Sequence, residues 1–242
     1  MDLDRTRADW TTLGAQDPLW AVLVNPQARH EGWQSQEFLE TGRREVDDVL
    51  ARVRALGMAP GTGAAVDFGC GAGRLSLALR AHFDRVVGID FSAPMLARAR
   101  ALDPDGTCQF VLNDSPDLQS FPTASFDLAY SSLVLQHIPT RRAAVYLSEL
   151  VRVVRPGGAV VVQVATRPDG SAKGRLAAVM PRSLMRFVQR RVLGYPAPMD
   201  MYPMPRSTVQ AAVGECGQVL AAWDEPMYGG HWRYTRYVVE RR

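Results

Sequence analysis

The sequence lacks the features that mark several other classes of protein. Its three cysteines, Cys70, Cys108 and Cys216, lie far apart and without metal-ligand spacing, which favours a reduced intracellular protein. No apolar run reaches the ~20 residues needed to span a bilayer. Residues 1–7 are too polar to begin a signal peptide. We therefore expect a cytoplasmic protein.

The net charge is small, and the chain contains little lysine. The 28 basic and 25 acidic residues leave a formal charge of +3, a surplus too small to imply a nucleic-acid partner. Lys173 is the only lysine, so almost all basic side chains are arginines. Hydrophobic residues make up 47% of the 242-residue chain, which is enough to bury one sizeable core.

The most informative stretch is a glycine-rich turn. An apolar run that contains Asp67 leads into Gly69, Gly71 and Gly73, and a helical pattern begins at Arg74. Glycines let a backbone approach a ligand and adopt left-handed angles, and a helix that starts beside them adds amide donors. The dinucleotide fingerprint requires a glycine where this chain has Arg74. An acid beside the turn suits an ammonium or sulfonium group better than a pyrophosphate.

Two further predicted strands end in polar residues. Asp90 follows an apolar strand about twenty residues after the glycine turn, where nucleotide-binding α/β units place a carboxylate for ribose hydroxyls. The next strand ends at Asn113, Asp114 and Ser115. These three residues suit either a ligand contact or a purely local turn.

Two more elements complete an α/β pattern. Residues 125–131 form an expected strand, and Gln136 and His137 follow it. Residues 156–158 read Pro-Gly-Gly, a strong turn signal. The apolar run over 159–165 is typical of a central strand buried on both faces.

In this order, the elements of residues 61–165 resemble the class I S-adenosylmethionine-dependent methyltransferases, whose first motif carries the same alternating glycines. The resemblance implies S-adenosylmethionine as the cofactor. It also implies an α/β fold with a Rossmann-like, seven-stranded, mostly parallel sheet and an antiparallel C-terminal hairpin. Residues 219–223 and 234–240 are the expected hairpin strands, and residues 207–217 the helix before them.

We divide the chain into four parts of one structural domain. Residues 1–58 form an N-terminal helical cap, and residues 59–165 form the S-adenosylmethionine-binding core. Residues 166–205 form an inserted helical lid that serves the acceptor, and residues 206–242 supply the last helix and the hairpin.

The resemblance places cofactor contacts at the glycine turn and at the strand ends. It implies Asp90 at the ribose and Asp114 at the adenine amino group. The run 41–43 in the cap helix either approaches the cofactor, with Arg43 at the methionine carboxylate, or is a packing glycine beside a surface arginine. The predicted cofactor-binding residues are Asp67, Gly69, Cys70, Gly71, Gly73, Asp90, Phe91, Asn113, Asp114, Ser115, Ser131, Thr41, Gly42 and Arg43.

Residues 176–192 show a basic helical pattern in which apolar side chains alternate with arginines. Three interpretations stay open: a lid over the acceptor pocket, a surface for a membrane or an anionic acceptor, or a solvated amphipathic helix. The run rich in Pro, Met and Tyr over 195–205 suits the wall of an acceptor site. The predicted acceptor-binding residues are Gln136, Trp33, Tyr195, Tyr202 and Trp232.

His137 is the expected general base for a hydroxyl acceptor, because in the family the end of the fourth strand lies beside the transferable methyl group. The alternative is a structural histidine at the start of the next helix. His231 is the second catalytic candidate. The loop after the fourth strand lacks the acids of magnesium-dependent relatives, so we expect no metal. We expect a small or medium organic acceptor, with a hydroxyl oxygen as the preferred atom.

Other functions stay open on the sequence alone. N- or C-methylation, or a non-methylation reaction of an S-adenosylmethionine-binding fold-mate, would carry the same five elements. Arg74 disfavours an NAD-dependent oxidoreductase, and a non-catalytic cofactor-binding protein is a further alternative. The acceptor and the oligomeric state do not follow from the sequence.

Overall fold

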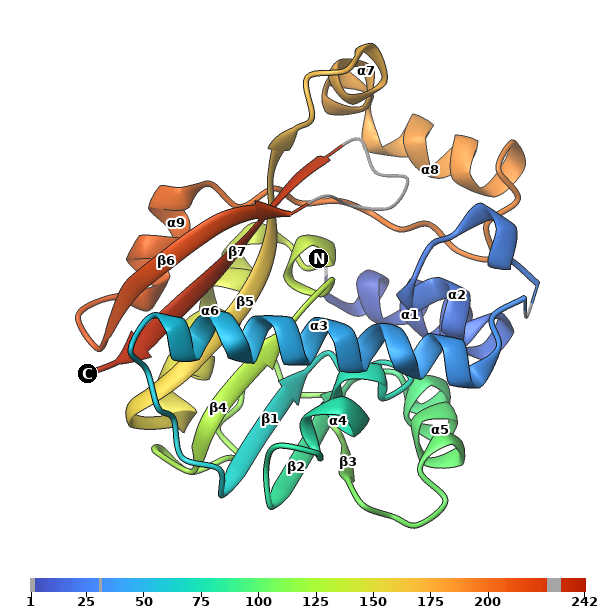
Figure 1. Ribbon diagram of the computed structural model, residues 1–242. Coiled ribbons are helices and arrows are strands. Elements are labelled where there is room, and N and C mark those ends of the chain that lie inside the picture. Colours follow the sequence, from blue (N-terminus) through green and yellow to red (C-terminus); the bar gives the residue numbers. More distant parts are fainter. Residues whose placement is uncertain (1–2, 31, 226–231) are drawn as a thin grey trace.

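The computed structural model describes residues 3–30, 32–225 and 232–242, which form one α/β domain (Figure 1). The strands are β1 (Ala64–Phe68), β2 (Arg85–Asp90), β3 (Gln109–Leu112), β4 (Phe126–Ser131), β5 (Val154–Pro168), β6 (Gly217–Glu225) and β7 (Trp232–Arg241). The α-helices are α1 (Leu3–Gln16), α2 (Pro18–Val22), α3 (Ser35–Ala55), α4 (Arg74–Leu79), α5 (Ala93–Leu102), α6 (Thr140–Val153), α7 (Ala172–Val179), α8 (Arg182–Arg191) and α9 (Arg206–Val213). None of the described helices is both long and apolar enough to cross a membrane.

The strands form one sheet in the order β3-β2-β1-β4-β5-β7-β6. Strands β1 to β5 pair in parallel, and β7 pairs antiparallel with both β5 and β6. The predicted seven-stranded, mostly parallel sheet with a C-terminal hairpin is therefore confirmed. The strand order reverses direction between β1 and β4, and sheets of this type bind ligands at the carboxyl ends of the strands beside such a reversal.

Helices cover both faces of the sheet (Figure 1). On one face, Leu50 of α3, Leu79 of α4 and Leu96 of α5 belong to one buried apolar cluster. On the other face, Leu147 of α6 and Val209 of α9 belong to a second cluster. Because helices bury both faces of the central strands, these strands are apolar at successive positions rather than alternately.

The glycine turn connects β1 to α4 as predicted. Gly69, Gly71 and Gly73 have φ angles of 74°, 52° and 82°, in the left-handed region that glycine adopts at low cost. A Cβ atom added to Gly69 would lie 2.3 Å from Val134, and one added to Gly71 would lie 2.9 Å from Val22. Two apolar side chains, one from the cap and one from the loop after β4, therefore make the close approach to this turn.

Helix α3 runs unbroken through the 41–43 stretch. A Cβ atom on Gly42 would lie 2.4 Å from the carbonyl oxygen of Arg74, so glycine lets α3 lie directly against the start of α4. Arg43 is exposed, and its guanidinium lies 3.3 Å from the Glu40 carboxylate. These contacts support the packing interpretation of Gly42.

Two predicted helix boundaries are wrong. The pattern over 176–192 is two helices, α7 and α8, because Pro181 has no amide donor and forces Met180 into an extended conformation with ψ of 128°. The helix expected over 207–217 ends at Val213, because Gly214 adopts a φ of 61° that stops the helix.

Candidate active site

A cavity of about 1060 Å³ is lined by residues at the carboxyl ends of the central strands. Its walls combine the cap, the glycine turn, the loop after β4, the lid and the hairpin. Asp90 and His137 line this same cavity, together with Trp10 and Tyr195. Its volume lies at the upper end of the range for small-molecule sites, about 300–1,000 Å³. It is large enough for two small ligands to lie side by side.

Asp90 borders the cavity at the end of β2. Its Oδ2 accepts a hydrogen bond from the Gly71 amide at 2.9 Å, and its Oδ1 accepts one from the Ser92 amide at 2.8 Å. Burial raises the pKa of Asp90, whereas the two amide donors favour the ionised form. The carboxylate is thus fixed to the turn and to the start of α5, and its other lone pairs can accept hydroxyl donors from a ligand.

A second, small pocket of about 20 Å³ adjoins Asp90 and is lined by Phe91, Asn113 and Val134, among others. This volume holds about one water molecule and is far too small for an aromatic base. An adenine ring at the ends of β2 and β3 therefore requires Val134 to move away from its place over the glycine turn.

Residues 113–115 form a local turn. Asn113 donates through Nδ2 to the Asp117 carbonyl at 3.0 Å and accepts from the Ser115 amide at 3.3 Å. Asp114 is exposed, and its carbonyl accepts a hydrogen bond from Arg7. Of the three predicted residues, Asn113 alone lines one of the two cavities described above.

Several predicted cofactor residues pack around the turn rather than line the larger cavity. Asp67 accepts a hydrogen bond from Ser76 Oγ at 2.7 Å, and burial raises the pKa of Asp67 to about 7. Burial also raises the pKa of the Cys70 thiol, which is therefore protonated at neutral pH. Ser131 donates to a carbonyl of β1 at 2.9 Å, and Gly73 packs against α5 and β3.

The cap and the loops supply most of the predicted acceptor contacts. Four of the five predicted residues line the cavity, namely Gln136, Trp33, Tyr195 and Trp232. Tyr202 is buried, and the Arg182 guanidinium lies 4.3 Å from its ring centroid. Thr41 and Phe91 also line the cavity, whereas Gly42 and Arg43 are absent from the part of its wall that the structure describes. His231 lies outside the described residues.

His137 follows the end of β4, as predicted. Its Nδ1 donates a hydrogen bond to the Asp200 carbonyl at 2.9 Å, and its ring meets the edge of Trp10 at 4.9 Å between centroids. Burial lowers the pKa of His137 to about 4, so the imidazole is neutral at pH 7. Because Nδ1 carries the proton, Nε2 is the nitrogen that can accept a hydrogen bond from a ligand.

The lid is tied to the cap by a buried arginine. Arg186 of α8 is only 8% exposed and lies 2.6 Å from both Asp9 of α1 and Asp200. Asp200 thus pairs with Arg186 through its side chain and with His137 through its carbonyl. A single residue therefore connects the lid helix to the histidine of the cavity wall.

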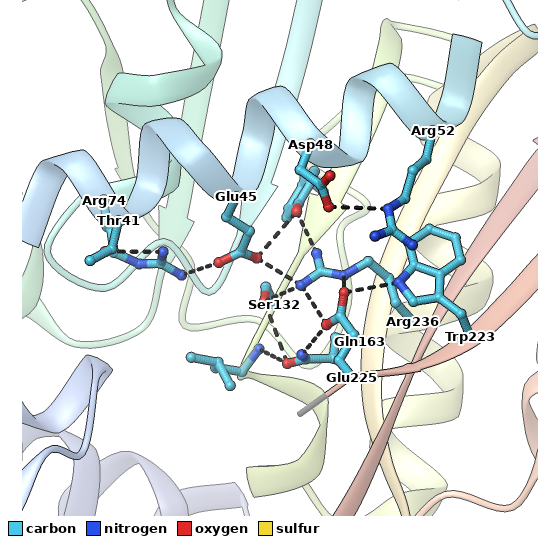
Figure 2. A network of polar contacts seen from close by, with 12 residues as sticks. Thr41, Glu45, Asp48, Arg52, Arg74, Ser132, Gln163, Trp223, Glu225 and Arg236 are labelled. Atoms are coloured by element: carbon cyan, nitrogen blue, oxygen red, sulfur yellow. Dashed lines mark hydrogen bonds and ion pairs between the residues drawn. The ribbon is translucent and has the colours of Figure 1, made fainter. Parts of the chain in front are cut away.

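Sequence analysis missed a polar network along another wall of the cavity. Figure 2 shows Glu45 of α3 between the guanidinium groups of Arg74 and Arg236, at 2.7 and 2.8 Å. Burial alone would raise the pKa of Glu45, but these two guanidinium groups lower it to about 2. All three side chains border the cavity.

Arg236 is the centre of this network. It lies within β7, is 2% exposed, and forms a two-pronged contact with Glu225 at 2.6 and 2.9 Å. It also donates to the hydroxyl of Tyr130, and Glu225 in turn accepts from Gln163 at 2.6 Å. The available sequence signal was an arginine directly before the apolar run 237–239.

The strand order, the glycine turn and the carboxylate at the end of β2 are those of a Rossmann-like α/β domain. Residues 66–162 match a family model described as a methyltransferase domain. This part of the chain is therefore similar to the methyltransferase domain of that family.

Two relatives and one solved structure indicate how far the similarity extends. A 2-methyl-6-phytyl-1,4-hydroquinone methyltransferase from Synechocystis is 34% identical over 158 residues, 63% of this chain and 48% of that protein. A malonyl-[acyl-carrier protein] O-methyltransferase from Salmonella typhimurium is 42% identical over 108 residues, 44% of this chain and 39% of that protein. The chain therefore spans about half or less of the length of these relatives. The structure of the Synechocystis magnesium protoporphyrin IX methyltransferase with bound S-adenosylhomocysteine has a TM-score of 0.61 at 19% identity and covers 84% of this chain and 85% of that one.

Two features of this structure fit S-adenosylmethionine, the cofactor of the family. Asp90 offers a fixed carboxylate for ribose hydroxyls. Gln136 lines the cavity, and its Oε1 is buried without a hydrogen-bond partner, so it can accept a hydrogen bond from a donor group of a ligand. Among the residues described, no three His, Cys, Asp or Glu side chains come together to hold a metal ion.

Replacing Arg236 with Met should lower the free energy of unfolding by about 3–5 kcal/mol, because Glu45 and Glu225 would each lose a buried partner. Arg233 on the same strand provides the control, since it is 49% exposed and pairs with Asp224 on the surface. Its replacement by Met should cost about 1 kcal/mol or less. Urea unfolding at pH 7 measures both, and equal losses would contradict the importance of the network.

His137 should make stability depend on pH in a defined window. Its pKa is about 4 in the folded chain against 6.5 for an ordinary histidine, so the unfolded state binds more protons between these values. The free energy of unfolding should therefore fall as pH decreases from 6.5 to 4, by about 3 kcal/mol in total. His137→Asn should lack this part of the decrease, and parallel curves for the two proteins would exclude a buried neutral histidine.

Proposed function

We propose that the protein transfers the methyl group of S-adenosylmethionine to a hydroxyl oxygen of a small or medium organic acceptor. One observation carries the proposal: the cavity lined by Gly71 and Asp90 of the cofactor motif is also lined by His137, a neutral imidazole. A molecule bound in this cavity can therefore lie close both to the methyl group of the cofactor and to a side chain that accepts its proton.

When bound, S-adenosylmethionine supplies a methyl group that is already activated on a sulfonium, so the protein mainly binds, orients and moves one proton. Asp90 would accept hydrogen bonds from the ribose hydroxyls of the cofactor. His137 Nε2 takes the acceptor hydroxyl proton as the oxygen gains the methyl group. The Asp200 carbonyl holds the ring through Nδ1 and stabilises the resulting imidazolium. No step requires a metal.

The cavity walls favour an acceptor with an apolar or aromatic body. Trp10, Trp33 and Tyr195 supply ring surfaces, and Met185 and Met199 supply adaptable side chains. The hydroquinone in the name of the Synechocystis relative carries hydroxyl groups and is compatible with a hydroxyl acceptor. The O-methylation named for the Salmonella relative supports an oxygen acceptor more generally, because the oxygen of a malonyl group belongs to a carboxylate. Methylation of nitrogen or carbon, and a non-methylation reaction, are alternative outcomes of the assays below.

Calorimetric titration tests the cofactor. The wild-type chain should bind S-adenosylmethionine and S-adenosylhomocysteine, and Asp90→Asn should weaken both at least about tenfold, because an amide replaces the carboxylate that accepts the ribose hydroxyls. Asp84→Asn is the control, since Asp84 is exposed and absent from the described cavity walls. Thermal melts check that both variants fold. Tight binding of NAD with no binding of S-adenosylmethionine would overturn the proposal.

Radiolabelled methyl transfer tests the base. His137→Ala should lower kcat/KM for a phenol or alcohol acceptor about a hundredfold, the low end of general-base effects, because a base of pKa about 4 is weak. Cofactor binding by the variant should stay unchanged. The matched control, His82→Ala, replaces a histidine that pairs with Asp47 away from the described cavity lining. Full activity of His137→Ala on a hydroxyl acceptor would exclude the proposed role.

A further inference from the structure

Helices α7 and α8 and the residues just after them expose an apolar surface, called the lid surface below. Six of the nine exposed large apolar side chains of the described chain lie on this segment. They are Leu176, Val179, Leu184, Phe187, Val192 and Leu193, between 46% and 77% exposed. A concentration of exposed apolar side chains on one segment indicates a site of interaction.

Helix α8 departs from a normal surface helix at two neighbouring positions. A helix on a globular domain turns its apolar face inward and its charges outward. In α8, Arg186 faces inward and is 8% exposed, whereas the next residue, Phe187, is 58% exposed. The inward face is held by the ion pairs of Arg186 with Asp9 and Asp200. The apolar face is therefore not used to hold α8 on the domain.

The lid surface also concentrates positive charge. Between Gly170 and Met199 the sequence contains six basic residues and no acidic one, although the whole chain has a formal charge of only +3. Arg175, Arg182, Arg190 and Arg191 are all exposed. Two copies of this surface would repel each other, and a nucleic acid would leave the apolar side chains without a partner. Apolar side chains bordered by arginines match the interface of an anionic bilayer.

We propose that the lid surface docks on an anionic phospholipid membrane, with Leu184 and Phe187 entering the interface and the exposed arginines contacting lipid phosphates. Figure 1 shows α7 and α8 at the outer edge of the molecule, beyond the end of β5, where a flat surface can reach them. This docking does not depend on the proposed methyl transfer.

Membrane docking through the lid surface would also bring the active-site cavity close to the membrane. The same two helices and the link between them contribute Ala177, Met180, Met185 and Gln189 to its wall. The lid is thus a thin layer between the lipid surface and the cavity. On the basis of the proposed function, it follows that the acceptor is an apolar molecule dissolved in the membrane.

Vesicle sedimentation with the full chain tests the proposal. The chain should sediment with vesicles that contain phosphatidylglycerol and phosphatidylcholine, much less with phosphatidylcholine alone, and less as salt increases. Phe187→Asp and Leu184→Asp should each weaken binding at least about tenfold, and Arg191→Glu should weaken it as well. Val145→Asp and Arg54→Glu place the same changes on α6 and α3 and should leave binding unchanged.

Calorimetric binding of S-adenosylmethionine by Phe187→Asp separates the two proposals. Phe187 is absent from the described cavity lining, so the variant should bind the cofactor normally while losing vesicle binding. No binding of the wild-type chain to anionic vesicles would overturn the membrane proposal and leave the methyl-transfer proposal intact. An equal loss of vesicle binding in the two control variants would also overturn the membrane proposal. So would a wild-type protein that binds no vesicles and forms a dimer that Phe187→Asp dissociates.

Discussion

The position of Glu45 between two buried guanidinium groups is the interaction on which the rest of the site depends. A buried charge is tolerated only with partners, and here each of the three charges has its partners among the others and Glu225. Arg74 begins the first core helix and Arg236 lies in the last strand. One carboxylate therefore fixes the cap to both the beginning and the end of the core, and Gly42 on the same helix permits the close approach.

The parts of the fold with local causes could be predicted from the sequence. Alternating glycines and strands that end in acids have a direct backbone reason, so the glycine turn, the sheet and the place of Asp90 and His137 were predictable. The turn expected at residues 156–158 is instead part of β5, where Gly157 has a φ of 79° and the pairing with β4 shifts register. The contact between Glu45 and Arg236 joins residues 191 positions apart in the sequence, and no local sequence pattern predicts that these two residues pair. Asn113, Asp114 and Ser115 were all predicted, but which of them borders a cavity could not be predicted, because all three are polar residues at one strand end until the turn is formed.

Helix α8 shows a different limit of sequence reasoning. A periodic pattern reveals that a helix has an apolar face and a charged face, but it does not say which face meets the domain. That choice depends on Asp9 and Asp200, two carboxylates from distant segments that surround Arg186. The lid also lies outside residues 66–162, the part that matches the family model. The acceptor walls are thus built mostly by the segments for which similarity gives the least guidance.

The valines over the glycine turn have a consequence for how the protein responds to its cofactor. Val22 and Val134 occupy the space beside Gly71 and Gly69, so a ligand that packs directly against this side of the turn must first displace both side chains. If the valines move in this way, the observed affinity equals the intrinsic affinity multiplied by the fraction of chains in which the turn is uncovered. Two residues that make no polar contact with the cofactor would in this way set the concentration at which the enzyme becomes saturated.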